Sequence, residues 1–233
     1  MRRALSVLPV GLTLWVAGCE PSVNSDLRRQ EFANLKQIGF AVHQYDNTHK
    51  RFPAAAIHDK SGKPLLSWRV ALLPSLGEGE LYNQFRVDEP WDSDHNIKLV
   101  RQMPDVYLTP GRNNEGKTSI MMFTGEETPF GGSEGPKGSD MPDGTSQTIM
   151  CVVAGADKAV RWTKPADLRF HANNPLVAMG KIPNDYFHAI LCDGAPVWIP
   201  SAIEPETLGR MITHDDGYKV DLTNIQQAAK GRR

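Results

Sequence analysis

Apolar side chains recur every three or four positions in one segment near the N-terminus. They are Phe32, Leu35, Ile38, Val42 and Tyr45, with Gly39 on the same side. This spacing places them along one face of a helix. Ser25 has the side chain of an N-cap, and Asp26 is favourable in a first helical turn. Because Phe52 precedes a proline, the chain is expected to be extended there. The pattern predicts one long amphipathic helix over residues 26–49.

The rest of the chain has the pattern of short elements. Apolar and β-branched runs predict strands at 106–109, 118–123 and 148–153, and a hairpin of 186–191 and 195–199 around Cys192-Asp193-Gly194. Short helices are expected near 97–101 and at 205–212. One long helix followed by short strands predicts an α+β fold, with the helix packed on an antiparallel sheet.

Several segments are less regular. Residues 54–64 are expected to form a loop or a short hairpin around Ser61-Gly62. Residues 67–85 carry two patterns, because Trp68, Val70 and Leu72 alternate like a strand, whereas Leu76, Leu81, Tyr82 and Phe85 suit a helix beyond Pro74. Residues 125–144 are rich in Gly, Pro, Ser and acidic residues, which is typical of a long functional or mobile loop.

The first residues have the pattern of a secretory signal. Arg2 and Arg3 precede an apolar run, and small residues lead to Cys19 in the order Val16-Ala17-Gly18-Cys19. This resembles the lipobox of bacterial lipoproteins, which implies cleavage before Cys19 and diacylglyceryl modification of its thiol. The alternatives are an ordinary cleavable signal or a short membrane anchor, since a spanning helix needs ~20 apolar residues.

The resulting domain organisation is simple. We expect a signal peptide at 1–18, a tether at 19–25, one domain at 26–222 and a frayed polar tail at 223–233. The domain would then be held to a bacterial membrane by lipid on Cys19, facing away from the cytoplasm.

Composition narrows the function classes. Hydrophobic residues make up 40% and charged residues 23% of the chain, which are globular values. A net charge of −1 gives no long-range field that favours nucleic acid. If Cys19 carries lipid, only Cys151 and Cys192 remain. They could form one disulfide in an oxidising compartment, or stay as buried free thiols.

An ordered set of motifs resembles a large bacterial family of pilin-like proteins of unknown function. The set comprises Asn34-Leu35-Lys36-Gln37-Ile38-Gly39, Arg51-Phe52-Pro53, Ser67 to Pro74, Leu81 to Phe85, Glu89 to Ser93, Asp143 to Ile149, Trp162 to Pro165, Asp193-Gly194, Thr207-Leu208 and Met211 to Thr213. The resemblance implies a pilin-like head with a long N-terminal helix on an antiparallel sheet.

The chain departs from that family in two ways. Most members begin with a prepilin-type glycine cleavage site and a long apolar helix containing a glutamate, whereas this chain has the lipobox. Many members carry a histidine ten positions before the C-terminal Asp-Gly, where this chain has Pro183. A role tied to that histidine therefore does not transfer.

Two sets of polar residues have the spacing of metal ligands. His43, Asp46 and His49 are three positions apart, so successive side chains move around the helix and do not stay on one face. The alternative is that they form part of its polar, solvent-facing surface. Asp92, Asp94 and Asn96 alternate in a loop near Glu89, as oxygen ligands of Ca²⁺ do. Against calcium, no glycine lies within that run, and Asp and Asn also form turns and caps.

Other candidates are weaker. Asp140 and Asp143 could do acid–base work in a cleft, or simply form turns. Ser133 and Ser139 lack a nucleophile-elbow motif. Trp91 and Trp162 lie near prolines and are the tryptophans to inspect for exposure.

These patterns favour a non-catalytic, lipid-anchored domain that acts by interaction or in the structure of the cell envelope. The expected partners are the membrane and an envelope protein, with no cofactor, no metal and no nucleic acid. The alternative is an extracytoplasmic solute- or glycan-binding lipoprotein, which requires a concave pocket with convergent polar groups. A hydrolase is disfavoured because no motif specifies a nucleophile.

The apolar face of the predicted helix can be tested directly by substitution. Leu35→Asp or Ile38→Asp should unfold the domain, because each removes ~1.5–3 kcal/mol of side-chain burial and adds a buried charge without a partner. Thermal melting followed by circular dichroism measures this. A variant that keeps the parental Tm would contradict the predicted packing.

Overall fold

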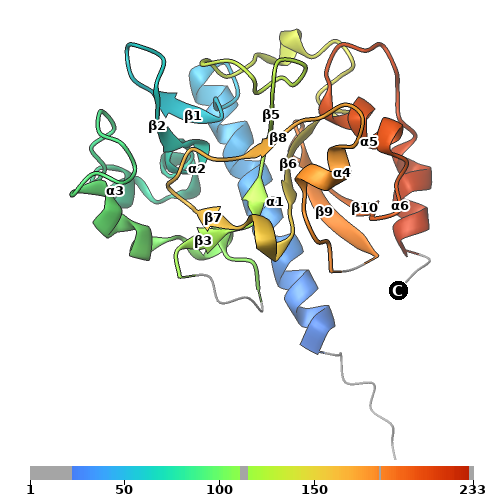
Figure 1. The fold of residues 1–233 in the computed structure, drawn as a ribbon, viewed down its shortest axis with the longest axis horizontal. Helices are drawn as coiled ribbons and strands as arrows, with labels where there is room; N and C mark the ends of the chain where they lie inside the picture. The colour runs from blue at the N-terminus through green and yellow to red at the C-terminus, as the bar shows by residue number, and fades with distance from the viewer. Residues whose placement is uncertain (1–22, 111–114, 184, 231–233) are drawn as a thin grey trace, which may run out of the picture.

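The longest element, α1 (Val23–His49), organises the molecule. The computed structural model describes residues 23–110, 115–183 and 185–230. Figure 1 shows α1 running diagonally across the molecule in this view, with its N-terminal end projecting beyond the body. Asp26 and Arg29 near that end are exposed, whereas Leu35 and Ile38 are fully buried. The helix predicted over 26–49 is confirmed and begins at Val23.

The remaining elements are short. The helices are α2 (Trp68–Ala71), α3 (Gly79–Tyr82), α4 (Pro175–Ala178), α5 (Pro205–Ile212) and α6 (Leu222–Lys230), with 3-10 turns η1 (Pro74–Leu76), η2 (Asn96–Gln102), η3 (Asp105–Tyr107), η4 (Gly138–Asp140) and η5 (Ala156–Lys158). The strands are β1 (Ala56–His58), β2 (Pro64–Ser67), β3 (Lys117–Thr118), β4 (Ile120–Met121), β5 (Phe123–Thr124), β6 (Ile149–Val153), β7 (Val160–Arg161), β8 (Leu168–Arg169), β9 (Tyr186–Leu191) and β10 (Pro196–Pro200).

A four-stranded antiparallel sheet in the order β10-β9-β6-β4 lies beside α1. Two-stranded ladders surround it: β1–β2 and β3–β7 are antiparallel, and β5–β8 is parallel. The fold is therefore α+β, as predicted. None of the helices in the described ranges combines the length and the apolar character that a bilayer crossing requires.

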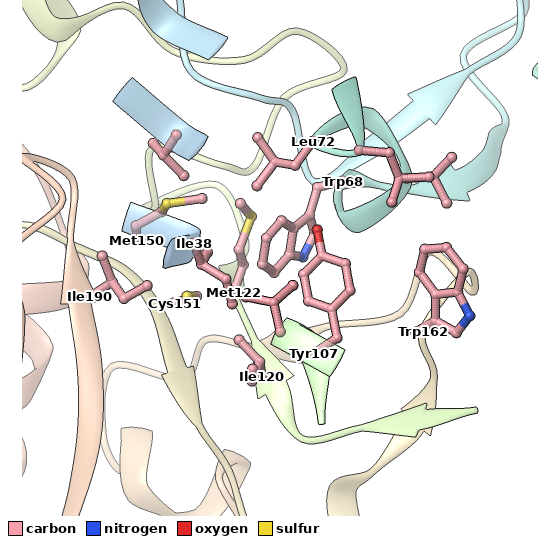
Figure 2. Packing of buried hydrophobic residues seen from close by; sticks show 14 of the residues in the cluster. Ile38, Trp68, Leu72, Tyr107, Ile120, Met122, Met150, Cys151, Trp162 and Ile190 are labelled. Atoms are coloured by element: carbon pink, nitrogen blue, oxygen red, sulfur yellow. The ribbon is translucent and has the colours of Figure 1, made fainter. Parts of the chain in front are cut away.

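The sheet separates two apolar cores. Ile190 and Cys151 face the first core, where they meet Ile38 of α1 (Figure 2). Leu191 and Val197 face the second core, which α5 closes with Leu208 and Met211. Because successive residues of a strand point to opposite faces, β9 contributes to both cores and is buried along its whole length.

A buried ion pair joins four distant segments within this architecture. Arg69 of α2 is fully buried, and its Nη2 donates to Oδ1 of Asp167 at 2.9 Å. The same oxygen accepts from the indole N–H of Trp68 at 3.2 Å and from the backbone N–H of Met122 at 2.9 Å. The hydroxyl of Tyr107 donates to the Arg69 carbonyl at 2.8 Å. Burial raises the pKa of the Asp167 carboxyl, and the charge of Arg69 offsets this only in part.

Two predicted strands differ from the structure, and one segment that the sequence left ambiguous is helical at its start. Residues 106–109 do not form a strand, because η3 follows Pro104 and turns both Val106 and Tyr107 into the first core. The ambiguous segment after Ser67 begins with α2 (Trp68–Ala71), since the Ser67 hydroxyl accepts from the Arg69 N–H and caps this helix. The strand expected at 118–123 is divided into the short pieces β3, β4 and β5, which pair with three different strands.

Other predictions are confirmed. The strand at 148–153 corresponds to β6, the hairpin of 186–191 and 195–199 to β9 and β10, and the helix at 205–212 to α5. The hairpin alternative for 54–64 is correct, since β1 and β2 pair across the Ser61-Gly62 turn. The helical turn near 97–101 lies within η2.

The prediction of a frayed tail from residue 223 is also wrong. Residues from Leu222 form α6, and Leu222 and Ile225 pack against the second core. Asp221 caps this helix by accepting from the backbone N–H groups of Thr223 and Asn224. The folded unit therefore extends beyond residue 222, to Lys230 in the described part of the chain.

The buried ion pair predicts a large stability effect. Asp167→Asn keeps an acceptor for the three donors but leaves the Arg69 charge unpaired in the core, so it should cost about 3–5 kcal/mol. Glu206→Gln removes one partner of an exposed helical ion pair with Arg210 and should cost less than ~0.5 kcal/mol. Urea unfolding of both variants measures the difference, and equal losses would show that the buried pair has no special role.

Candidate functional site

The best-defined junction in the molecule joins α1 to the β9–β10 hairpin. Gly39 faces Gly194 so closely that a Cβ atom on Gly39 would lie 2.3 Å from the Gly194 carbonyl oxygen. Gly194 has a φ of 81°, as its hairpin turn requires. One turn further along α1, His43 Nε2 donates to the carbonyl oxygen of Asp193. These two contacts fix the position of the hairpin along the axis of α1.

An aromatic cluster forms the second half of this junction. The His188 ring on β9 packs edge-on against Trp198 of β10 at 4.3 Å between centroids. Phe32 of α1 lies 5.1 Å from the Trp198 ring. Arg28 donates to the Tyr186 hydroxyl at 2.8 Å and lies over its ring. We call Glu31, Phe32, Gly39, His188 and Trp198 the α1–hairpin junction.

A carboxylate–imidazole pair stabilises this junction. His188 Nδ1 donates to Oε1 of Glu31 at 2.5 Å, and the His188 side chain is 1% exposed. Its Nε2 atom is buried and has no hydrogen-bond partner among the described residues. Since neither nitrogen reaches solvent, the pair is suited to holding α1 on the sheet and not to proton exchange with a substrate.

The long loop 125–144 is fastened to the end of α1. The Phe52 N–H donates to the Pro136 carbonyl at 2.8 Å, and Arg51 pairs with Glu134 at 2.5 Å. A Cβ atom on Gly135 would lie 1.7 Å from the Phe52 carbonyl oxygen. A surface hollow of about 400 Å³ lies here, lined by residues that include Arg51, Lys137 and His214.

The two aspartates of this loop are used in turns. Asp140 accepts from the Lys137 N–H at 2.8 Å, and this bond holds the pKa of its carboxyl below the usual value. Asp143 accepts from the N–H groups of Asp216 and Gly217, which connects the loop to the end of α5. The Ser139 hydroxyl donates to Asp140. The geometry therefore agrees with the turn-forming alternative.

The candidate metal ligands are dispersed. His43 contacts the hairpin, whereas His49 donates from Nδ1 to the Tyr45 carbonyl at 3.0 Å and stacks on the Tyr45 ring. Nowhere in residues 23–110, 115–183 and 185–230 do three His, Cys, Asp or Glu side chains gather closely enough to hold a metal ion.

Asn96 organises the loop that was the calcium candidate. Its buried amide nitrogen donates to the carbonyls of Arg86, Glu89 and Pro90, at 2.9 to 3.1 Å. Its oxygen accepts from the Arg86 N–H at 3.0 Å. Asp92 and Asp94 are exposed. Because Asn96 is already bonded to the backbone at both amide atoms, its position agrees with the capping alternative.

The cysteines and tryptophans are mostly buried. Cys151 and Cys192 are free thiols within the first core, and burial raises the pKa of Cys151 to about 12. The bridge is therefore absent between these two described residues, and such thiols are poor nucleophiles. Trp162 is fully buried, and Trp91 is half-buried beside Lys164. Cys19 and the predicted signal peptide lie outside the described residues.

Sequence analysis missed His188 and Glu31. The partners are 157 residues apart, so no local pattern connects them. One signal was available: His188 is the polar residue within the otherwise apolar and aromatic strand Tyr186–Leu191, whose residues are all buried. A histidine in that setting needs a partner, although sequence alone does not identify Glu31.

Comparison with known proteins gives one similarity. Residues 29–119 match the sequence model of a family described as a protein of unknown function (DUF1559). The match covers less than half of the 233 residues. It runs from the exposed part of α1 to β3 and includes the Asn34–Gly39 and Ser67–Pro74 motifs, in agreement with the expected resemblance to a family of unknown function. No curated protein and no solved structure matches the chain.

The close contact at Gly39 predicts that adding a methyl group there lowers stability, whereas the same change at another helical glycine does not. Gly39→Ala forces α1 and the hairpin apart and should destabilise the fold by about 1–3 kcal/mol, as overpacking does. Gly209→Ala in α5 is the control, since its added Cβ meets nothing within 4 Å. That change should be neutral or stabilise the helix by up to ~1 kcal/mol. Equal effects on Tm would contradict the close approach.

Proposed function

We propose that the chain is a lipid-anchored, pilin-like interaction domain of the bacterial cell envelope, without a catalytic role. The observation that supports this proposal is the position of α1. Its N-terminal end projects from the body, while further along one face of the helix, with Leu35, Ile38 and Val42, is buried in the first core. The first residues of the helix, before Arg28 contacts Tyr186, would then act as a short stalk that carries the body.

The anchor would lie close to this projecting end. Cys19 is four residues before Val23, so the two are at most ~14 Å apart. The pilin-like description rests on a long N-terminal helix packed on an antiparallel sheet. In this proposal the lipid takes the place of the apolar half-helix that the pilin-like family uses for assembly.

The polar groups at the junction and in the loop support a role in interaction and not in catalysis. Glu31 and His188 hold α1, and Asp140 and Asp143 hold turns, so their bonding capacity serves the fold. The exposed surface of loop 125–144 and the half-exposed Trp198 would then be available to an envelope partner.

A solute-binding lipoprotein is the second candidate, and one observation favours it. A hollow of about 450 Å³ is lined by Asp157, Asp167, Arg169 and His171, among others. Oδ2 of Asp167 accepts no hydrogen bond from the described residues, because its three donors all bind Oδ1. A small cationic solute that raised Tm at millimolar concentration would support this candidate.

The anchor has a direct test. The wild-type chain should incorporate labelled fatty acid, remain with the membranes and give an intact mass that begins at a diacylglyceryl Cys19. Cys19→Ala should carry no label and leave the membrane fraction, whereas Ser22→Ala, which keeps the lipobox, should behave as wild type. A retained leader, or an unmodified Cys19 in the wild type, would refute the lipid-anchored part of the proposal.

A further inference from the structure

Basic side chains from three segments gather on one surface. Lys98 and Arg101 belong to η2, Lys117 to β3 and Arg161 to β7, and all four are exposed. Lys98, Arg101 and Arg161 line the same hollow, where Glu115 is the acidic residue of the described lining. We call these four residues the basic cluster. None of them forms an ion pair with another described residue.

The ladder β3–β7 places two of these charges in direct opposition. Lys117 and Arg161 are cross-strand partners. Like charges at such positions destabilise a strand pair. Some cations elsewhere in the chain have carboxylate partners, including Arg51 with Glu134 and Arg86 with Glu89. The basic cluster therefore has cationic groups that an external anion could neutralise.

The backbone beneath the cluster is closely packed. Gly116 has a φ of 75°, and a Cβ atom there would lie 2.6 Å from the Val100 carbonyl oxygen. The buried Trp162 donates from its backbone N–H to the Gly116 carbonyl and from its indole N–H to the Val100 carbonyl, both at 3.0 Å. One tryptophan thus joins η2 to β3–β7 and fixes the backbone segments from which the basic side chains extend.

The cluster lies toward the projecting end of α1. Figure 1 shows β3 and β7 at the border of the body on that side. The segment after η2 is bound to α1 itself, because the Asn34 amide donates to the carbonyls of Asp105 and Leu108 at 3.2 Å. If Cys19 is lipidated, an inclined α1 brings this surface to the bilayer.

We propose that the basic cluster binds the phosphate groups of anionic phospholipids and so forms a second attachment to the membrane. This inference rests on the proposed lipid anchor for its location. One acyl anchor together with a basic patch is a known physical route to stable membrane attachment. The second contact would also fix the inclination of the body on the surface.

The test uses the chain from residue 20, which contains every described residue and lacks the anchor. It should co-sediment with vesicles of phosphatidylcholine mixed equally with phosphatidylglycerol, and not with phosphatidylcholine alone. Arg101→Gln combined with Lys117→Gln should weaken binding about 25-fold, since each basic residue near the surface contributes about fivefold. Salt should weaken wild-type binding as well.

The control removes the same charge elsewhere. Lys60→Gln combined with Lys63→Gln changes two lysines at the β1–β2 turn, on the side of the molecule away from the projecting end of α1 (Figure 1). This variant should bind almost as wild type. Equal binding of the two double variants, or equal binding to both vesicle types, would overturn the proposal. The proposal would also be overturned if inorganic phosphate, added at constant ionic strength, displaced the chain from the vesicles. That result would indicate a site for soluble anions.

The two proposals fail independently. Vesicle binding by the unanchored chain reports only on the basic cluster, whereas fatty-acid labelling reports only on Cys19. Binding without labelling would retain the basic cluster and reject the anchor, and labelling without vesicle binding would do the reverse. An unchanged Tm in both double variants verifies that the exposed substitutions leave the fold intact.

Discussion

The ion pair of Arg69 and Asp167 is the interaction on which the part of the structure around the first core depends. The Asp167 carboxylate accepts hydrogen bonds from Trp68, Arg69 and Met122. Arg69 also donates to the Ile120 carbonyl, from Nε at 3.0 Å and from Nη2 at 2.5 Å. None of these segments forms a regular sheet long enough to position itself. A charge pair with several hydrogen bonds is costly to bury but sets one geometry, because any other arrangement leaves charges unpaired.

The α1 helix connects this polar centre to the sheet. Its stripe packs on the first core, while Gly39 and Glu31 fix its contact with the β9–β10 hairpin. The second core on the other face of the sheet is closed by α5 and α6. The projecting end of α1 and the basic cluster are thereby held in a constant relation, since Asn34 bonds to the segment that follows η2.

Local patterns predict the parts of this fold that are stabilised locally. The 26–49 stripe, the β6 run and the turn at Asp193-Gly194 each have a period or a turn residue that sequence displays. The two-residue strands β3, β4 and β5 have no such period. Arg69 and Asp167 are 98 residues apart, and Glu31 and His188 are 157 apart, so their pairing follows from tertiary structure alone. The Asp221 cap of α6 lies within a polar segment, for which the sequence analysis predicted a frayed tail.

The distance in sequence between Gly39 and Gly194 has a consequence for biogenesis. The apolar face of α1 is among the first parts of the domain to be synthesised, and the hairpin that covers it comes 155 residues later. At bacterial and eukaryotic elongation rates of ~5–20 residues per second, that interval is about 8–30 s. During this interval the apolar face of the nascent helix lacks the hairpin that covers it in the folded domain, so this part of the native packing forms late.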